Sequence, residues 1–231
     1  MSARTNEKRQ DALRSFIESN KDLLGLSGTQ VSQLEQTADY TNPDGNLSFT
    51  HLEQKINGVP VFRGEVKAAF TKRGEIVRII NNLAPELIYE SVSIDFGSAQ
   101  EALRFAAANI NYELKTEDII PNDADSTDLK QVFGSGDWSS TAEKMYFPVE
   151  AGVACPAWRV LIWEKVNAYY VIVDANTGEM LWRKNITEDQ TQTATFSVYA
   201  NPNAMINVAH NPFSLSPGAS NPNLGTQGAA A

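Results

Sequence analysis

The dipeptide Asn57-Gly58 constrains the fold of this chain most, because residues of alternating polarity flank it on both sides. Both residues tolerate the positive φ angles of a two-residue type I′ turn, so the pair is a strong signal for a β-hairpin. Residues 46–56 and 59–70 alternate at period two and are the two expected arms. A third strand is expected over residues 76–83. Together these segments predict an antiparallel sheet.

Helical spacing of apolar residues predicts helices before and after this sheet. Apolar side chains within residues 13–24 recur at spacings of three, four and seven, and Gly25 is placed to end that helix. Thr29 is expected to cap a short helix that follows. Residues 98–110 predict another helix, capped by its first residue, with Phe105 on its buried face.

A meander of four strands is expected after the helix at residues 98–110, because short turns separate runs of β-branched and aromatic residues. A sheet with one apolar face needs a helix to cover it, so this helix and meander form an α+β unit. The fold class of the whole chain is therefore predicted to be α+β. The expected strands are residues 144–149, 157–163, 169–173 and 179–184, with one further strand at 193–199.

The remaining segments are predicted to be connections. Residues 84–96 are expected to be extended because Pro85 disfavours a helix, and the acidic residues 117–140 are expected to form an irregular surface excursion. Residues 201–231 are rich in Asn, Pro, Ser, Gly and Ala, and bury too little surface to offset their ordering entropy. The expected domains are an N-terminal helical segment at 1–40, a first domain with its connector at 41–96, a second domain at 97–200 and a flexible linker at 201–231.

Composition and charge exclude several classes of function. The formal net charge of -9 repels nucleic acids and anionic lipid, so neither is an expected partner. No apolar run approaches the roughly 20 residues that span a bilayer, and the first ten residues lack the hydrophobic stretch of a signal peptide. The single cysteine, Cys155, excludes an internal disulfide and a multi-thiolate metal site, and is expected to be a small buried side chain.

Catalytic motifs are missing from the sequence. The two histidines are His51, in a predicted strand, and His210, in the tail, and no H-E-x-x-H places two imidazoles on one helix for zinc. The run from His51 to Glu53 lacks the P-C-x-x-C partner of a zinc deaminase. No G-x-S-x-G elbow is present, and Cys155 has no histidine near it in sequence. The chain is therefore predicted to be non-catalytic.

Two further groups of residues have both a structural and a functional interpretation. The acidic residues Asp123, Asp125 and Asp128 suggest calcium, but the central Gly and terminal Glu of an EF-hand loop are absent, which favours a solvated loop. Aromatic residues at strand spacing suggest a binding platform, but aromatics favour strands in any case, which favours sheet core. These aromatic residues are Trp158, Trp163, Tyr169, Tyr170 and Trp182.

Two segments resemble known families. Residues 51–83 closely resemble the fungalysin/thermolysin propeptide domain, which is marked by a Gln, a Gly-Val-Pro-Val hairpin and a later turn Gly. Residues 157–185 resemble a PepSY domain. The residues that carry the first resemblance are Gln54, Gly58, Val59, Pro60, Val61, Gly64 and Gly74, and those that carry the second are Trp158, Tyr170, Asp174, Ala175, Gly178 and Glu179.

The order of the two segments is similar to the pro-region of fungalysin-like zinc metallopeptidases. The resemblance implies two cystatin-like units, each a helix on an antiparallel sheet, that help a secreted or periplasmic peptidase to fold and inhibit it. The implied partner is the cognate catalytic domain, which is absent from these residues and is where zinc is expected, so no cofactor is expected here. We expect the hairpin to contact this partner, although the same residues also have a purely structural interpretation. The expected contact residues are Gln54, Gly58, Val59, Pro60, Val61 and Phe62.

Two alternatives remain open at this point. The run from Gln54 to Gly58 is similar to the Q-x-V-x-G hairpin of cystatins, so a free-standing protease inhibitor is the second interpretation. A small binding module of the cell envelope is the third. A titration against papain-like and thermolysin-like enzymes distinguishes the first two.

Overall fold

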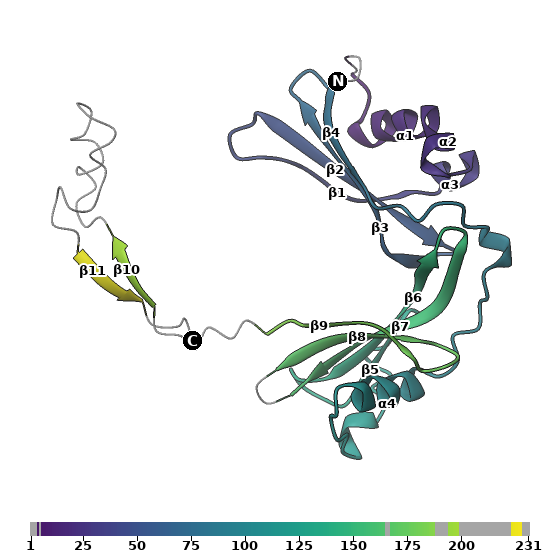
Figure 1. The fold of residues 1–231 in the computed structure, drawn as a ribbon, viewed down its shortest axis with the longest axis vertical. Coiled ribbons are helices and arrows are strands. Elements are labelled where there is room, and N and C mark those ends of the chain that lie inside the picture. Colours follow the sequence, from purple (N-terminus) through teal and green to yellow (C-terminus); the bar gives the residue numbers. More distant parts are fainter. Residues whose placement is uncertain (1–3, 5, 165–166, 188–193, 199–222, 228–231) are drawn as a thin grey trace. The chain divides into compact units, whose positions relative to one another are not determined.

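The computed structural model describes residues 4, 6–164, 167–187, 194–198 and 223–227. Contacts divide the chain into two units, Met1–Ile186 and Thr187–Ala231. The first unit is an α+β structure whose strands are mostly antiparallel (Figure 1). The fold class predicted from the sequence is therefore confirmed at this level.

Three short helices open the first unit. The helix predicted before Gly25 is interrupted at Asn20 and forms two helices, and Gly25 ends the second with φ of 64°. The cap of the next helix is Ser27 rather than the predicted Thr29. The Ser27 hydroxyl accepts from the backbone of Gln30, and the Gln30 side chain accepts from the backbone of Ser27, which is a capping box. The helices are α1 (Arg9–Ser19), α2 (Lys21–Leu24) and α3 (Gly28–Ser32).

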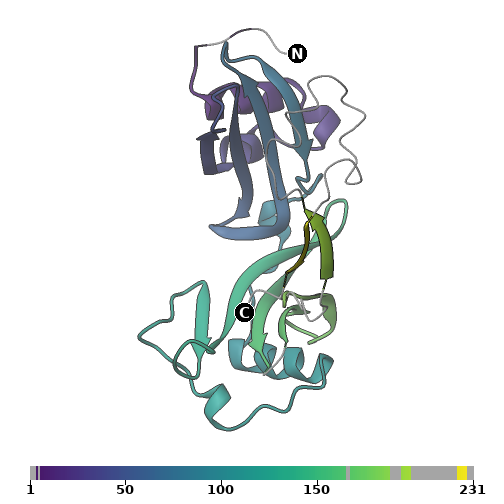
Figure 2. The same cartoon turned by 90° about the vertical axis from the view of Figure 1, so that its left-hand side faces the viewer.

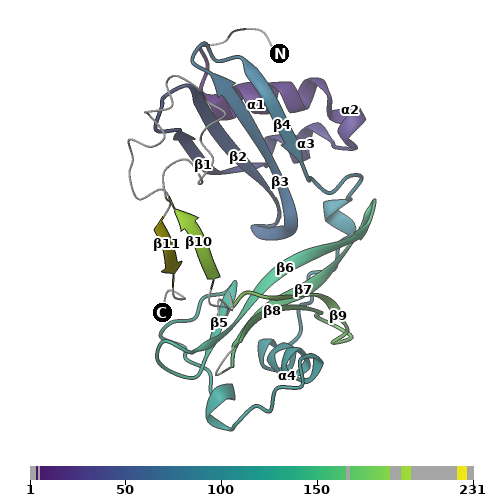
Figure 3. The ribbon, with the colours of Figure 1, turned by 60° about the vertical axis from the view of Figure 1, so that its left-hand side comes forward.

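Four antiparallel strands follow in the order β1-β2-β3-β4. Helices α1–α3 lie against one face of these strands (Figures 2 and 3). Strand β1 was not predicted, because most of its residues fall in the segment 1–40 that was predicted to be helical. These residues form a strand because they pair with β2. The strands are β1 (Glu35–Thr41), β2 (Leu47–Ile56), β3 (Val59–Thr71) and β4 (Ile76–Asn81).

A second group of antiparallel strands is covered by one helix. Helix α4 has Ser98 as its predicted N-cap, but Phe105 is 41% exposed rather than buried and its ring lies against Gly178. One strand, β5, lies in the segment predicted to be irregular. The elements are η1 (Tyr89–Ser91), α4 (Ala99–Asn109), η2 (Glu117–Ile119), β5 (Lys130–Phe133), β6 (Ser140–Glu150), β7 (Val153–Trp163), β8 (Ala168–Asp174) and β9 (Met180–Asn185).

The two groups of strands are continuous through β3. One parallel pair, Val61 with Tyr146, joins β3 to β6 and makes a nine-stranded sheet. The first unit nevertheless has two large hydrophobic cores. One lies between α1–α3 and the first group of strands and includes Leu13 and Leu52. The other lies between α4 and the second group and includes Trp158.

The second unit contains a two-stranded antiparallel sheet. Strand β10 (Ala194–Val198) agrees with the strand predicted at 193–199, and it pairs with β11 (Asn223–Gln227). Strand β11 falls in the segment predicted to be a flexible linker. The rest of that segment, including His210, lies outside the described residues.

Candidate functional site

The β2–β3 hairpin has the predicted turn and an unexpected bulge. Asn57 and Gly58 have φ of 52° and 81°, as a type I′ turn requires. Glu53 pairs with Glu65 and Lys55 pairs with Pro60, so Gln54 alone faces the four residues 61–64 of β3. Such a bulge bends its strand and re-aims the side chains on it.

Gly64 is required inside this bulge for reasons of space. A Cβ atom at Gly64 would lie 2.9 Å from Cβ of Val61 and 3.1 Å from Oε1 of Gln54. Since the backbone at Gly64 passes this close to Val61 of β3 and Gln54 of β2, a larger residue would displace both side chains. The glycine and the glutamine of the sequence pattern therefore belong to one packed arrangement.

The Gln54 side chain is completely buried and holds the connector that follows β4. Its Oε1 accepts a hydrogen bond from the backbone nitrogen of Ala84 at 2.8 Å. Its Nε2 donates to the backbone oxygen of Ala84 at 3.1 Å and to the hydroxyl of Tyr89 at 3.0 Å. Burying an amide is stabilising only when its polar atoms find partners, and here the oxygen and both N–H groups have one.

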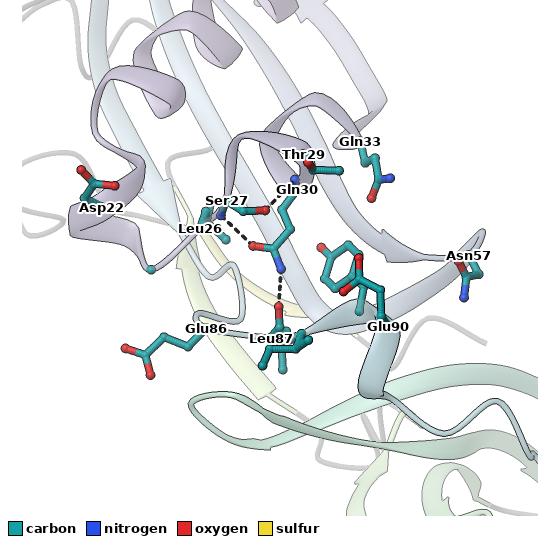
Figure 4. Close-up of a pocket in the computed structure, with 13 residues that line it drawn as sticks. Asp22, Leu26, Ser27, Thr29, Gln30, Gln33, Asn57, Glu86, Leu87 and Glu90 are labelled. Carbon is teal, nitrogen blue, oxygen red and sulfur yellow. Dashed lines mark hydrogen bonds between the residues drawn. The ribbon is translucent and has the colours of Figure 1, made fainter.

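A second glutamine holds the same connector from the helical side. Nε2 of Gln30 donates to the backbone oxygen of Leu87, and the backbone nitrogen of Glu86 donates to the oxygen of Gly25 at 2.7 Å. Figure 4 shows Gln30 between Ser27 and Leu87 in the wall of a surface pocket of about 840 Å³. The residues that line this pocket include the three carboxylates Asp22, Glu86 and Glu90, and no histidine or cysteine.

The hairpin crosses from one core to the other. Leu52 of β2 and Val66 of β3 belong to the core under α1–α3. Toward the turn, Ile56, Val59 and Val61 belong to the core under α4. The tip of the hairpin is thus a structural joint between the two groups of strands, and the bulge is what turns it from one core to the other.

The six predicted contact residues are divided between the interior and the surface. Gln54, Val59 and Val61 are at most 7% exposed, so they are not available to a partner in this structure. Gly58 is exposed, and Pro60 and Phe62 are half-buried. The structural interpretation of the motif therefore accounts for the three buried residues, while contact with a partner stays a prediction for Gly58, Pro60 and Phe62.

An aromatic cluster lies beside the bulge, on the face of the second group of strands that α4 does not cover. Phe62 stacks on Phe147 with ring centroids 5.2 Å apart, and its centroid is also 5.2 Å from that of Trp182. The guanidinium carbon of Arg63 lies 5.2 Å from the Phe62 centroid and 5.4 Å from the Trp182 centroid. Arg63 and Phe147 were not predicted from the sequence, because neither belongs to a motif and the residues that surround them are distant in sequence.

The remaining candidate residues have structural surroundings. His51 packs edge-on against Tyr40, with ring centroids 5.7 Å apart. Burial, with the neighbouring Asp174 carboxylate, raises the pKa of the Cys155 thiol to about 12, so the reactive thiolate is scarce at neutral pH. Within the part of the chain that the structure describes, no three His, Cys, Asp or Glu side chains are grouped to hold a metal ion.

The acidic loop is exposed, and of the aromatic residues singled out from the sequence Trp158 lies in the core while the other four are half-buried. Asp123 and Asp128 are exposed, and Asp125 accepts a hydrogen bond from Asn122 at 2.8 Å. Trp158 is buried, and its indole nitrogen donates to the backbone oxygen of Phe96 at 2.6 Å. No helix among the described residues is long and apolar enough to span a membrane.

Comparison with protein families bears on the hairpin directly. Residues 32–83 match the family described as the Fungalysin/Thermolysin Propeptide Motif. The motif covers β1–β4 and ends one residue before Ala84, which the buried Gln54 holds. The matched residues thus include the hairpin and its bulge, while Ala84, the main hydrogen-bond partner of Gln54, lies just outside them.

Other comparisons add little to this result. A solved structure, the Bacillus megaterium YpeB C-terminal domain, is similar to 80% of this chain and 68% of that chain, with 12% sequence identity and a TM-score of 0.32. No curated protein matches the chain.

Proposed function

We propose that this chain is the non-catalytic pro-region of a fungalysin/thermolysin-type zinc metallopeptidase, which it helps to fold and inhibits. The observation that carries the proposal is the propeptide motif at residues 32–83. Zinc belongs to the catalytic domain of the partner. Such peptidases are extracellular, and the same location is proposed for this chain. The helix α4 on its antiparallel strands supports a PepSY-like domain at 97–200, and α1–α3 on β1–β4 support a second cystatin-like unit.

The physical basis of the proposed function is binding to the folded state. A partner that binds only the folded enzyme stabilises it by mass action, and the same contact blocks the enzyme's cleft. Rigid surfaces bind more tightly because less motion is lost on association. The joint held by Gln54 and Gln30 provides such rigidity next to the exposed turn at Gly58.

An inhibition titration tests the proposed function. The purified chain is added in increasing amounts to thermolysin, to the catalytic domain of a fungalysin and to papain. We expect at least one of the two metallopeptidases to lose activity with increasing amounts of the chain, and papain to stay active. Inhibition of papain alone would favour the cystatin-like alternative, and no inhibition of any enzyme at large excess would contradict the proposal.

A test of whether the hairpin contacts the partner requires a variant that leaves the structural joint intact. Deleting the tip would remove Val59 and Val61 from the core, so a surface change at Pro60 is the better test. We expect Pro60→Glu to weaken metallopeptidase inhibition. Pro43→Glu, in the exposed turn between β1 and β2, is the matched control and should inhibit like the wild type. Equal inhibition by both variants, with unchanged thermal unfolding, would exclude Pro60 from the contact.

A further inference from the structure

Arg63 has a backbone conformation that its residue type disfavours. Its φ is 55°, in the left-handed region where side chains with a Cβ are uncommon outside Asn and Asp. The bulge opposite Gln54 imposes this conformation, and Gly64 follows because no Cβ fits there. Non-glycine residues held in this way concentrate at functional sites, since the surrounding structure must compensate for the strain.

The guanidinium of Arg63 is oriented without an anionic partner. It lies over the rings of Phe62 and Trp182, and Arg63 is exposed. Among the described residues, no hydrogen bond or ion pair engages its N–H donors, although the chain has nine more acidic than basic residues. Four of the other arginines form ion pairs, and Arg73, Arg78, Arg104 and Arg183 form none among the described residues. The pairs are Arg4 with Glu75, Arg9 with Asp39, Arg14 with Asp11 and Arg159 with Glu143.

The surroundings of Arg63 are largely apolar. Phe62, Phe147 and Trp182 are half-buried and cover the small core of Met145, Ala157 and Ile172. Lys184, two residues after Trp182 in β9, and Asp174, two residues after Ile172 in β8, share this face by strand alternation. We call Phe62, Arg63, Phe147 and Trp182 the arginine patch.

We propose that the arginine patch docks a surface carboxylate of the metallopeptidase catalytic domain, with the aromatic rings contacting apolar side chains around that carboxylate. This inference rests on the proposed function. A planar guanidinium pairs with a carboxylate through two parallel hydrogen bonds, and stacking on aromatic rings leaves its edge free to do so. Arginine and tryptophan in a partly desolvated setting are also the residues that contribute most to binding at protein interfaces.

The decisive variant is Arg63→Gly, because it removes the guanidinium and relieves the backbone strain together. We expect its apparent inhibition constant against the inhibited metallopeptidase to rise about 10- to 100-fold, the range for a hydrogen bond to a charged group. Its unfolding midpoint in urea should equal or exceed that of the wild type, since glycine accepts φ of 55° freely. Arg63→Lys keeps the charge but not the paired donors, and should be intermediate.

Arg104→Ala is the matched control, because Arg104 is an exposed arginine on α4 and the change in net charge is the same. It should inhibit within about 2-fold of the wild type, the range expected for an exposed charge away from the interface. If Arg63→Gly inhibits as well as Arg104→Ala does, the arginine patch is not the docking surface and the proposed function still holds.

A second measurement covers the case in which the wild type inhibits neither thermolysin nor the fungalysin domain. The side-chain Nε–H signal of Arg63 is then followed by NMR during titration with the peptide acetyl-Leu-Glu-Leu-amide. A saturable shift in the wild type, with no response of the other arginine signals, supports carboxylate binding at the patch while the proposed function fails. No shift at millimolar peptide overturns the patch as well.

Discussion

Replacement of Gln54 by alanine tests the claim that this residue is a structural anchor. The change removes three hydrogen bonds and leaves the backbone nitrogen and oxygen of Ala84 and the hydroxyl of Tyr89 without this partner. At about 1 kcal/mol for each bond, the loss is about 3 kcal/mol, and the buried methylene adds about 0.8 kcal/mol. We therefore expect the free energy of unfolding to fall by about 3–4 kcal/mol.

Urea denaturation followed by tryptophan fluorescence measures this loss. Gln131→Ala is the matched control, because Gln131 is a half-buried glutamine whose side chain makes one hydrogen bond, to the oxygen of Thr127. The control should lose about 1 kcal/mol or less. A loss of less than about 1 kcal/mol for Gln54→Ala would refute the anchoring role.

The pKa of Tyr89 provides an independent readout of the same contact. Burial raises the pKa of the Tyr89 phenol, and the hydrogen bond from Gln54 partly opposes this because it stabilises the phenolate. Without Gln54, burial acts with less opposition, so the pKa of Tyr89 should rise further. Ultraviolet titration at alkaline pH detects this change, and a lower pKa in the variant would show that the removed bond does not act on Tyr89.

Three further changes test separate parts of the structure. Gly64→Ala should destabilise the chain by about 2 kcal/mol, because the new Cβ clashes with side chains in the bulge. The loss should exceed that for Gly58→Ala, whose Cβ meets open space and which is opposed only by the left-handed φ. Equal urea midpoints for the two variants would contradict this. The raised pKa of the Cys155 thiol stabilises the fold below pH 9, and this contribution disappears as the pH rises toward 12. The free energy of unfolding of Cys155→Ala should therefore fall less steeply than that of the wild type between pH 9 and pH 12. An identical pH profile for the two proteins would be evidence against this contribution. Ser27→Ala should cost about 1 kcal/mol because it removes the hydroxyl that accepts from the backbone nitrogen of Gln30. A smaller loss for Ser27→Ala than for Thr29→Ala would favour Thr29, the cap predicted from the sequence.

Local signals in the sequence predicted the elements that depend on neighbouring residues. The type I′ turn at Asn57-Gly58, the cap at Ser98 and the end of a helix at Gly25 are all set within a few residues. Strands β1 and β5 were missed because their conformation depends on pairing with β2 and β6 rather than on their own residues.

The candidate site was only partly predictable for the same reason. Gln54 is recognisable as part of a motif, but its role depends on Ala84, which lies 30 residues away. A glutamine in a strand gives no signal that it is buried. Arg63 lacked a signal too, since its position follows from the extra residues in the bulge and from Trp182 in a distant strand.

Refolding of a catalytic domain in the presence of this chain tests the central proposal most directly. A fungalysin catalytic domain is unfolded in guanidinium chloride and diluted into zinc-containing buffer, with the chain or with an equal amount of Gln54→Ala. After removal of the chain, we expect the wild-type chain to have raised the recovered peptidase activity and the variant to have raised it less. Equal recovery with and without the wild-type chain would contradict the proposed function.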